Sequence, residues 1–412
     1  MARVNKYLFG LSLGVLTVVF AAALAGSAHA QAPIRIAGSL PISGTYAELG
    51  KGHERGYAVC LKQANDRGGV LGRQLEYKFE DDQSQAANAE AIYEKILGNK
   101  QADLIFSPYS SPITERVASV TEKYKMPMVA AGAASTSIFK KGRQYVFMIL
   151  SPASSYLEGL VDLASKRGLK TLAVLYEETL FTKAVANGTV EFAKKRGMQV
   201  VVLEPYPRKT TDFSKMLEKV KAANADVVAA ATYFNDSVAI IQQMKALDIN
   251  PRMTGVTVGG DLPKFYTTLK DAAEFVYGAS QWQAELVHMR AGGLVPIARL
   301  YPGAQEFVEQ HEKMFPGAGV SYQTAGAYGA CQILIEAVRR AGSLDGDKVR
   351  DALVKYEANT AFGAYRVDPT GFQLAHKMIM FQWQDGKKVI VWPEELAAER
   401  PRFPTPPWNK RQ

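Results

Sequence analysis

Residues 34–64 read IRIAGSLPISGTYAELGKGHERGYAVCLKQA, and they contain the first structural unit of the fold. The apolar, isoleucine-containing run at residues 34–40 is typical of a buried β-strand. One apolar helix face then follows at the spacing i, i+3, i+4 and i+7, formed by Tyr57, Cys60, Leu61 and Ala64. A strand that leads directly into an amphipathic helix predicts an α/β fold.

The same alternation continues as far as residue 149. Strands are expected at residues 75–79, 103–106, 128–130 and 145–149. A helix is expected over residues 84–97, and another opens at Pro112, where proline fits the first helical turn. This order predicts a parallel sheet with helices on both faces.

A second α/β series follows the first. Its helices are expected at residues 154–167, 182–196, 213–223 and 237–246, and its strands at residues 171–175, 199–203, 226–230 and 253–256. The fold class is therefore α/β, with two doubly wound, Rossmann-like lobes.

The rest of the chain leaves this alternation. Helices at residues 303–314, 321–341 and 347–356 come in succession, so we expect them to return to the first lobe. Residues 377–392 read as a hairpin turning at Asp385-Gly386, which we expect to join the second lobe. Five prolines in residues 393–412 predict an extended C-terminal strap.

The first thirty residues have the pattern of a secretory signal peptide. Arg3 and Lys6 precede an apolar run at residues 8–24, and Ala28-His29-Ala30 fits a small-x-small cleavage site. A transmembrane helix is the alternative, but two glycines interrupt the run and no basic stop-transfer cluster follows it. We expect export, with cleavage after Ala30.

Charge and cysteine content limit the possible partners. The formal charge of +9 falls to +7 without Arg3 and Lys6, and the basic residues are dispersed among acidic ones, so we expect no nucleic-acid partner. Cys60 and Cys331 both lie in helical patterns. We favour two buried free thiols, while pairing stays open because the sequence gives no Cα separation.

Residues 36–50, IAGSLPISGTYAELG, and residues 65–82, NDRGGVLGRQLEYKFEDD, resemble the branched-chain amino acid (leucine, isoleucine, valine) binding proteins of bacterial ABC importers. The similarity extends along most of the chain after the signal segment and is weakest after residue 296. It implies a type I periplasmic binding fold, a periplasmic location, a ligand between the lobes, and an inner-membrane permease and ATPase as partners.

The resemblance also implies that the chain passes between the lobes three times, near Ile149, Trp282 and Ala361. The first lobe would then comprise residues 31–149 and 282–360. The second would comprise residues 150–281 and 361–392, followed by the strap. A ligand-sensing subunit of a receptor or regulatory system is the alternative function for the same fold.

Enzyme signatures are absent from the sequence. It contains no Gly-x-Ser-x-Gly elbow and no Walker lysine loop, and His311-Glu312 lacks the second histidine of a zinc-binding helix. We therefore expect a binding protein rather than an enzyme, with neither a cofactor nor a metal.

The first lobe contributes two predicted ligand-binding loops and a tyrosine. Ser110 and Ser111 follow a strand and open a helix, where hydroxyl and backbone N–H groups favour an anion; N-capping is the alternative for each serine. The resemblance places Ser111 at a ligand carboxylate. It also implies that the loop after the next strand contacts the polar head of the ligand. Ala133 and Ser135 are the preferred contact residues in that loop, and Ala134 is an alternative. Tyr46 is a candidate pocket wall or an exposed loop residue.

The second lobe contributes Phe181, Tyr233 and Thr257 at its strand exits. Aromatic side chains there would pack on the ligand when the lobes close. Thr257 is a departure, because the resemblance places near it the acidic partner of a ligand ammonium group. Either Asp261 substitutes for that residue or the ligand lacks an amino group. We therefore expect an amino acid or a related aromatic or aliphatic carboxylate.

Overall fold

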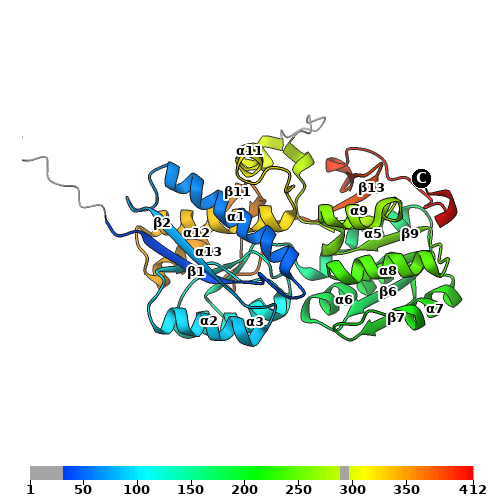
Figure 1. Cartoon of the computed structure of the whole chain (residues 1–412), viewed down its shortest axis with the longest axis horizontal. Helices are drawn as coiled ribbons and strands as arrows, with labels where there is room; N and C mark the ends of the chain where they lie inside the picture. The colour runs from blue at the N-terminus through cyan, green and yellow to red at the C-terminus, as the bar shows by residue number, and fades with distance from the viewer. Residues whose placement is uncertain (1–30, 288–296, 412) are drawn as a thin grey trace, which may run out of the picture.

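The computed structural model describes residues 31–287 and 297–411. They form two α/β lobes that lie side by side (Figure 1). The predicted signal peptide, residues 1–30, lies outside the described residues. Within the two described ranges, no helix combines the length and the apolar composition needed to cross a membrane.

The first lobe is built on parallel strands, as the sequence predicted. The strand order is β2-β1-β3, and a single bridge from Tyr109 to Gly132 leads to the parallel pair β4-β5. The strands are β1 (Ile34–Leu40), β2 (Leu75–Asp81), β3 (Leu104–Ile105), β4 (Met128–Ala130) and β5 (Val146–Met148). The intervening helices are α1 (Ala47–Asp66), α2 (Ala86–Gly98), α3 (Ser111–Tyr124) and the short α4 (Thr136–Phe139).

The second lobe contains a seven-stranded sheet in the order β14-β13-β10-β9-β8-β6-β7. Its strands are β6 (Thr171–Glu177), β7 (Gln199–Tyr206), β8 (Val227–Ala231), β9 (Met253–Val256), β10 (Tyr277–Ser280), β13 (Ile379–Gln384) and β14 (Lys387–Trp392). Its helices are α5 (Glu158–Lys166), α6 (Leu180–Lys195), α7 (Ser214–Ala223), α8 (Phe234–Ala246) and α9 (Pro263–Leu269). The predicted hairpin β13-β14 joins this sheet, with β13 antiparallel to β10.

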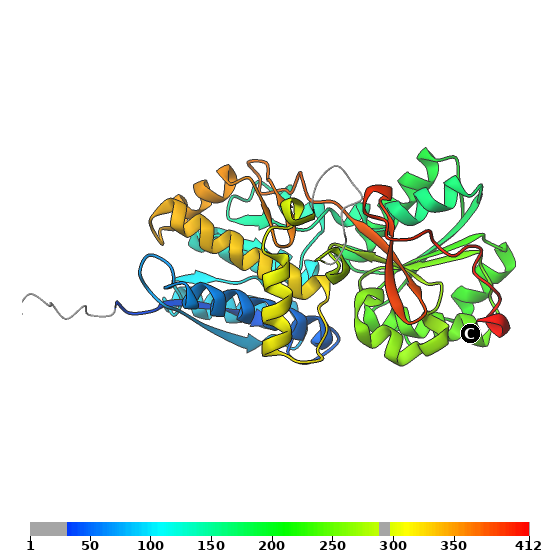
Figure 2. The ribbon, with the colours of Figure 1, turned by 90° about the horizontal axis from the view of Figure 1, so that it is seen from above.

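The tail helices return to the first lobe, as predicted. They are α11 (Ala304–Met314), α12 (Tyr322–Ala341) and α13 (Gly346–Lys355), preceded by the short α10 (Ile297–Leu300). Figure 2 shows α12 running alongside the N-terminal helix α1. The two helices approach closely at Gly56, where a Cβ would lie 2.0 Å from the Thr324 carbonyl oxygen.

Cys60 on α1 and Cys331 on α12 form a disulfide, with Cα atoms 6.2 Å apart. The interpretation of two free thiols is therefore wrong. The close packing of α1 on α12 brings the two cysteines together, although 271 residues separate them in the sequence.

The third passage between the lobes lies later than the predicted position near Ala361. A two-stranded hairpin, β11 (Ala358–Thr360) and β12 (Gly363–Tyr365), first extends the chain beside the first lobe. The Gly371 carbonyl then accepts a hydrogen bond from Met148 N, 2.8 Å away, at the end of β5. The chain enters the second sheet only at Ile379, because these contacts hold the preceding segment to the first lobe.

Residues 393–411 run as an extended segment over the second lobe, interrupted by two single-turn 3₁₀ helices, Glu394–Leu396 and Trp408–Lys410. Backbone N–H groups tie this strap to the lobe: Arg402 N donates to the Gln382 side chain at 2.8 Å, and Thr405 N donates to the Arg252 carbonyl at 3.0 Å.

Candidate functional site

A small cavity of about 10 Å³, enough for about one water molecule, lies between the two lobes. The first lobe lines it with residues that follow β3 and β4, and the second lobe lines it with residues that follow β6, β8 and β9. Carboxyl ends of parallel strands are the usual place for a ligand in such sheets. The lining residues are His53, Tyr109, Ser110, Ser111, Ala131, Gly132, Ala134, Leu150, Tyr156, Phe181, Tyr233, Val258 and Tyr322.

Ser110 occupies the N-cap position of α3 but does not cap the helix. Its backbone is extended and its side chain makes no capping hydrogen bond. The Ser110 Oγ atom is buried and has no hydrogen-bond partner. The N-capping alternative is thus wrong for this side chain, and a hydroxyl group is left facing the cavity at the positive end of a helix.

Ser111 connects the two predicted loops of the first lobe. Its Oγ accepts hydrogen bonds from Ala134 N at 3.1 Å and from Ser135 N at 3.2 Å. A serine oxygen has two lone pairs, so both are occupied and the hydroxyl hydrogen remains to donate. No described residue accepts it. Ser111 can therefore donate to a bound anion.

The loop after β4 places its three predicted residues differently. Ala134 lines the cavity, and its carbonyl already accepts a hydrogen bond from Ala153 N at 2.8 Å. Ser135 is fully buried and its Oγ has no partner. Ala133 is also fully buried but lies outside the lining. Ser135 lies outside the lining as well, so only Ala134 of the three predicted residues reaches the cavity.

Aromatic side chains close the cavity from both lobes. Tyr46 is 1% exposed, so the exposed-loop alternative is wrong. Its ring lies 4.8 Å from that of Tyr233 across the cleft. Tyr233 in turn contacts Phe181 at 5.7 Å, and Phe181 contacts Tyr156 at 4.9 Å. A planar apolar ligand would be surrounded by rings.

Thr257 does not line the cavity; its neighbour Val258 does. The Thr257 hydroxyl donates to the Thr232 carbonyl at 2.6 Å and accepts from Thr232 N at 2.8 Å. This pair of hydrogen bonds ties the ends of β8 and β9 together. The Thr257 hydroxyl hydrogen therefore has a partner within the protein and is not available to a ligand.

Asp261, the acidic alternative, is also fully engaged within the protein. Its side chain is buried, with Oδ1 3.2 Å from Lys388 Nζ and Oδ2 accepting from Tyr322 N at 2.9 Å. Among the described residues, no aspartate or glutamate lines the cavity.

His53 is a lining residue that the sequence analysis missed. It lies on α1 and is fully buried, and its Nδ1 lies 3.0 Å from the Leu49 carbonyl. Its Nε2 has no partner, and burial lowers its pKa to about 4. The sequence did place His53 one helical turn before Tyr57, on the predicted apolar face of the helix, which indicates that it is buried. A single histidine there is weak evidence on its own.

Several polar contacts cross the cleft and hold the lobes together in this closed arrangement, among them the bond from Ala153 N to the Ala134 carbonyl. Lys264 Nζ lies 3.1 Å from Glu48 Oε1, and Arg208 Nη2 donates to the Tyr46 hydroxyl at 3.4 Å. Tyr322 N donates to Asp261 across the same cleft. Glu177 is buried beside Arg208, and burial raises its pKa to about 7.

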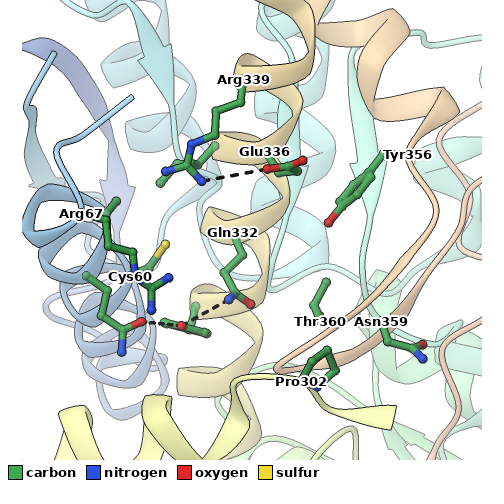
Figure 3. Close-up of a pocket in the computed structure, with 13 residues that line it drawn as sticks. Cys60, Arg67, Pro302, Gln332, Glu336, Arg339, Tyr356, Asn359 and Thr360 are labelled. Carbon is green, nitrogen blue, oxygen red and sulfur yellow. Dashed lines mark hydrogen bonds and ion pairs between the residues drawn. The ribbon is translucent and has the colours of Figure 1, made fainter. Parts of the chain in front are cut away.

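A second cavity lies on the first lobe beside Cys60 (Figure 3). Its polar side chains are paired with one another: Tyr328 donates to Gln63 Oε1 at 2.6 Å and accepts from Gln332 Nε2 at 3.2 Å, and Arg339 lies 4.0 Å from Glu336. These groups need no ligand. The buried unpaired groups distinguish the interlobe cavity as the candidate site.

Comparisons with known proteins agree with this architecture. A family model described as periplasmic binding protein matches residues 33–388. Leu/Ile/Val-binding protein homolog 7 of Brucella suis is 28% identical, and the alignment covers 97% of this chain and 100% of that protein.

Solved structures show the same fold. A leucine-binding protein, LivK, from Thermotoga maritima matches with a TM-score of 0.77 at 20% identity, over 87% of this chain and 97% of that one. An ABC-transporter solute-binding protein from R. palustris, solved in complex with benzoate, matches with a TM-score of 0.74 at 16% identity, over 89% of this chain and 98% of that one.

Proposed function

Because the chain belongs to the periplasmic binding protein family, we propose that it binds a small carboxylate between its lobes and delivers it to the permease of an ABC importer. The observation that carries this proposal is the pair of hydroxyls of Ser110 and Ser111, which line the cavity. Both are buried, and neither has a described protein acceptor for its hydrogen.

A carboxylate fits these hydroxyls because it only accepts hydrogen bonds. Hydrogen bonds to an ionised group stabilise a complex more than bonds between neutral groups do. The N-terminus of α3 also points the positive end of its helix dipole at this position. Such contacts offset the loss of hydration when the anion enters a closed cavity.

The absence of a lining carboxylate among the described residues argues against an amino acid. A buried ligand ammonium group would have no anionic partner, since Asp261 already pairs with Lys388 and Thr257 faces Thr232. The proposed ligand is therefore an aromatic or aliphatic carboxylate without an amino group. The rings of Tyr156, Phe181 and Tyr233 support an aromatic body.

Lobe closure follows from the division of the lining. The serines lie on the first lobe, and Phe181, Tyr233 and Val258 lie on the second. A ligand touches both sets only when the lobes are together, so its binding energy shifts the population toward the closed form. Hinge closure of this kind is a general property of periplasmic binding proteins.

A thermal-shift screen tests the ligand class directly. Leucine, isoleucine and valine are compared with benzoate and 4-methylpentanoate, because a ligand that binds only the folded protein raises its melting temperature. We expect stabilisation by the carboxylates and not by the amino acids. Stabilisation by leucine but not by 4-methylpentanoate would contradict the proposal.

A further inference from the structure

His53 places a hydrogen-bond acceptor among the donors of the first lobe. We propose that His53 determines specificity: its Nε2 accepts a hydrogen bond from a hydroxyl group of the ligand, so the cavity selects hydroxy-substituted carboxylates. This inference rests on the carboxylate site proposed above and names a subset of that ligand class.

The role of Nε2 follows from the partner of the other ring nitrogen. Nδ1 lies 3.0 Å from the Leu49 carbonyl oxygen, which can only accept, so Nδ1 carries the hydrogen. In a neutral imidazole the second nitrogen then has a lone pair. The ring stays neutral near pH 7 because burial lowers its pKa to about 4, which outweighs the opposite effect of the Leu49 and Ala131 backbone groups. The rings that face it, Tyr57 and Tyr109, carry no charge there.

Gly132 leaves space at this nitrogen. A Cβ on Gly132 would lie 3.0 Å from His53 Nε2 and 2.5 Å from the Tyr109 ring. Every larger residue would therefore crowd Nε2 and displace Tyr109. With glycine at this position, His53, Tyr109 and Gly132 all line the interlobe cavity.

The acceptor lies beside the carboxylate-binding hydroxyls. Tyr109 and Gly132 are bridged to each other, and they directly precede the two loops that carry Ser110, Ser111 and Ala134. The His53 ring contacts Tyr109 at a centroid distance of 5.0 Å. A small ligand can therefore meet donors with its carboxylate and the acceptor with a nearby hydroxyl.

A hydroxyl suits this acceptor better than an ammonium group or no donor at all. An ammonium would bring a buried charge to a neutral ring, with no lining carboxylate among the described residues to balance it. An unsubstituted acid would leave Nε2 buried without a partner, which is costly. A neutral O–H satisfies the nitrogen without adding charge.

Calorimetry on the purified protein tests the selection with matched pairs. One set is benzoate with 2-, 3- and 4-hydroxybenzoate, and the other is 4-methylpentanoate with 2-hydroxy-4-methylpentanoate. Since an unpaired buried acceptor weakens binding by about tenfold or more, at least one hydroxy acid should bind that much more tightly than its parent. Parent acids that bind as tightly as every hydroxy analogue would overturn the inference.

Substitution of the ring identifies the residue responsible. In His53→Phe the ratio of hydroxy-acid to parent-acid affinity should fall to about 1, and His53→Gln, which keeps an acceptor, should retain part of it. His311→Phe is the matched control, because His311 is also fully buried but lies outside the cavity. A wild-type ratio in His53→Phe would overturn the inference.

A spectroscopic measurement covers the case in which His53→Phe does not fold. In ¹⁵N-histidine-labelled wild-type protein, the unprotonated Nε2 resonance of His53 should shift when the tighter-binding hydroxy acid is added, and less with the parent acid. A protonated Nε2 in the complex would overturn the inference. Failure of every carboxylate to bind the wild type would instead refute the proposed function.

Discussion

The two lobes present opposite chemistry to the cavity between them. Among its lining atoms, the first lobe leaves Ser110 Oγ and His53 Nε2 buried without partners. In the second lobe, polar groups that follow the strands bond to each other, as Thr257 and Thr232 do. This lobe therefore lines the cavity mainly with aromatic rings. Among the described residues of the second lobe that line the cavity, only Tyr233 has a buried side-chain polar atom, its hydroxyl, without a hydrogen-bond partner.

The two lobes therefore recognise different parts of a ligand. Unpaired buried polar atoms are unfavourable unless something completes them, so the first lobe is built around a polar head group. The aromatic rings and Val258 contribute apolar contact area but few directional hydrogen bonds. The second lobe therefore covers the body of the ligand and closes the cavity. Four substitutions test this division between the lobes.

The disulfide gives the largest expected effect, and it acts on the first lobe alone. Cys60→Ala with Cys331→Ala should lower the free energy of unfolding by about 2–5 kcal/mol, because the crosslink closes a very long loop. Urea denaturation, with and without a reductant, measures this. The second lobe has no described cysteine, so an unchanged first unfolding transition would show that the α1–α12 crosslink does not hold the first lobe.

Ser111→Ala should weaken carboxylate binding by about tenfold to a hundredfold, because it removes a donor to an ionised group. The loss should be similar for aromatic and aliphatic acids, since it concerns the shared head group. Ser237→Ala is the matched control on the second lobe, where the serine hydroxyl is buried and bonded to Thr232 and Tyr233. Equal losses of affinity in both variants would erase the proposed division between the lobes.

Phe181→Leu should weaken binding by about threefold to tenfold, since it removes ring contact from a nearly buried position. In contrast to Ser111→Ala, the loss should be larger for benzoate than for 4-methylpentanoate. Isothermal titration of both acids measures the ratio. A uniform loss for the two acids would mean that the second lobe does not recognise the ligand body.

The weakest effect is expected at the rim of the cleft. Lys264→Met removes the ion pair to Glu48, whose side chains are 51% and 37% exposed. Exposed pairs contribute at most about 1 kcal/mol and are screened by salt. We expect affinity to fall about twofold in low salt and to match the wild type in high salt. A tenfold, salt-independent loss would show that the rim, rather than the cavity, controls closure.

Local patterns predicted most of the fold because strands and helices in α/β lobes are strongly periodic. The short strand β10, YGAS, escaped prediction because its small residues carry no alternation. The third passage was misplaced because the contact between Met148 and Gly371 is long-range. The disulfide was missed for the same reason, since only the packing of α12 on α1 reveals it.

The candidate site was predicted best where it follows the strand exits. Ser110, Ser111, Ala134, Phe181 and Tyr233 all line the cavity. His53 and Tyr322 could not be found in this way, because they lie within or at the start of helices that only the tertiary fold brings to the cleft. The hydrogen bonds that occupy Thr257 are likewise set by the register of β8 and β9.

A crystal structure of the protein grown with the carboxylate that raises its melting temperature most tests the central claim directly. The account predicts the carboxylate within hydrogen-bonding distance of Ser111 Oγ and Ser110 Oγ, with the ligand body against Phe181 and Tyr233. A carboxylate that points into the second lobe, or a ligand in the cavity beside Cys60, would contradict it.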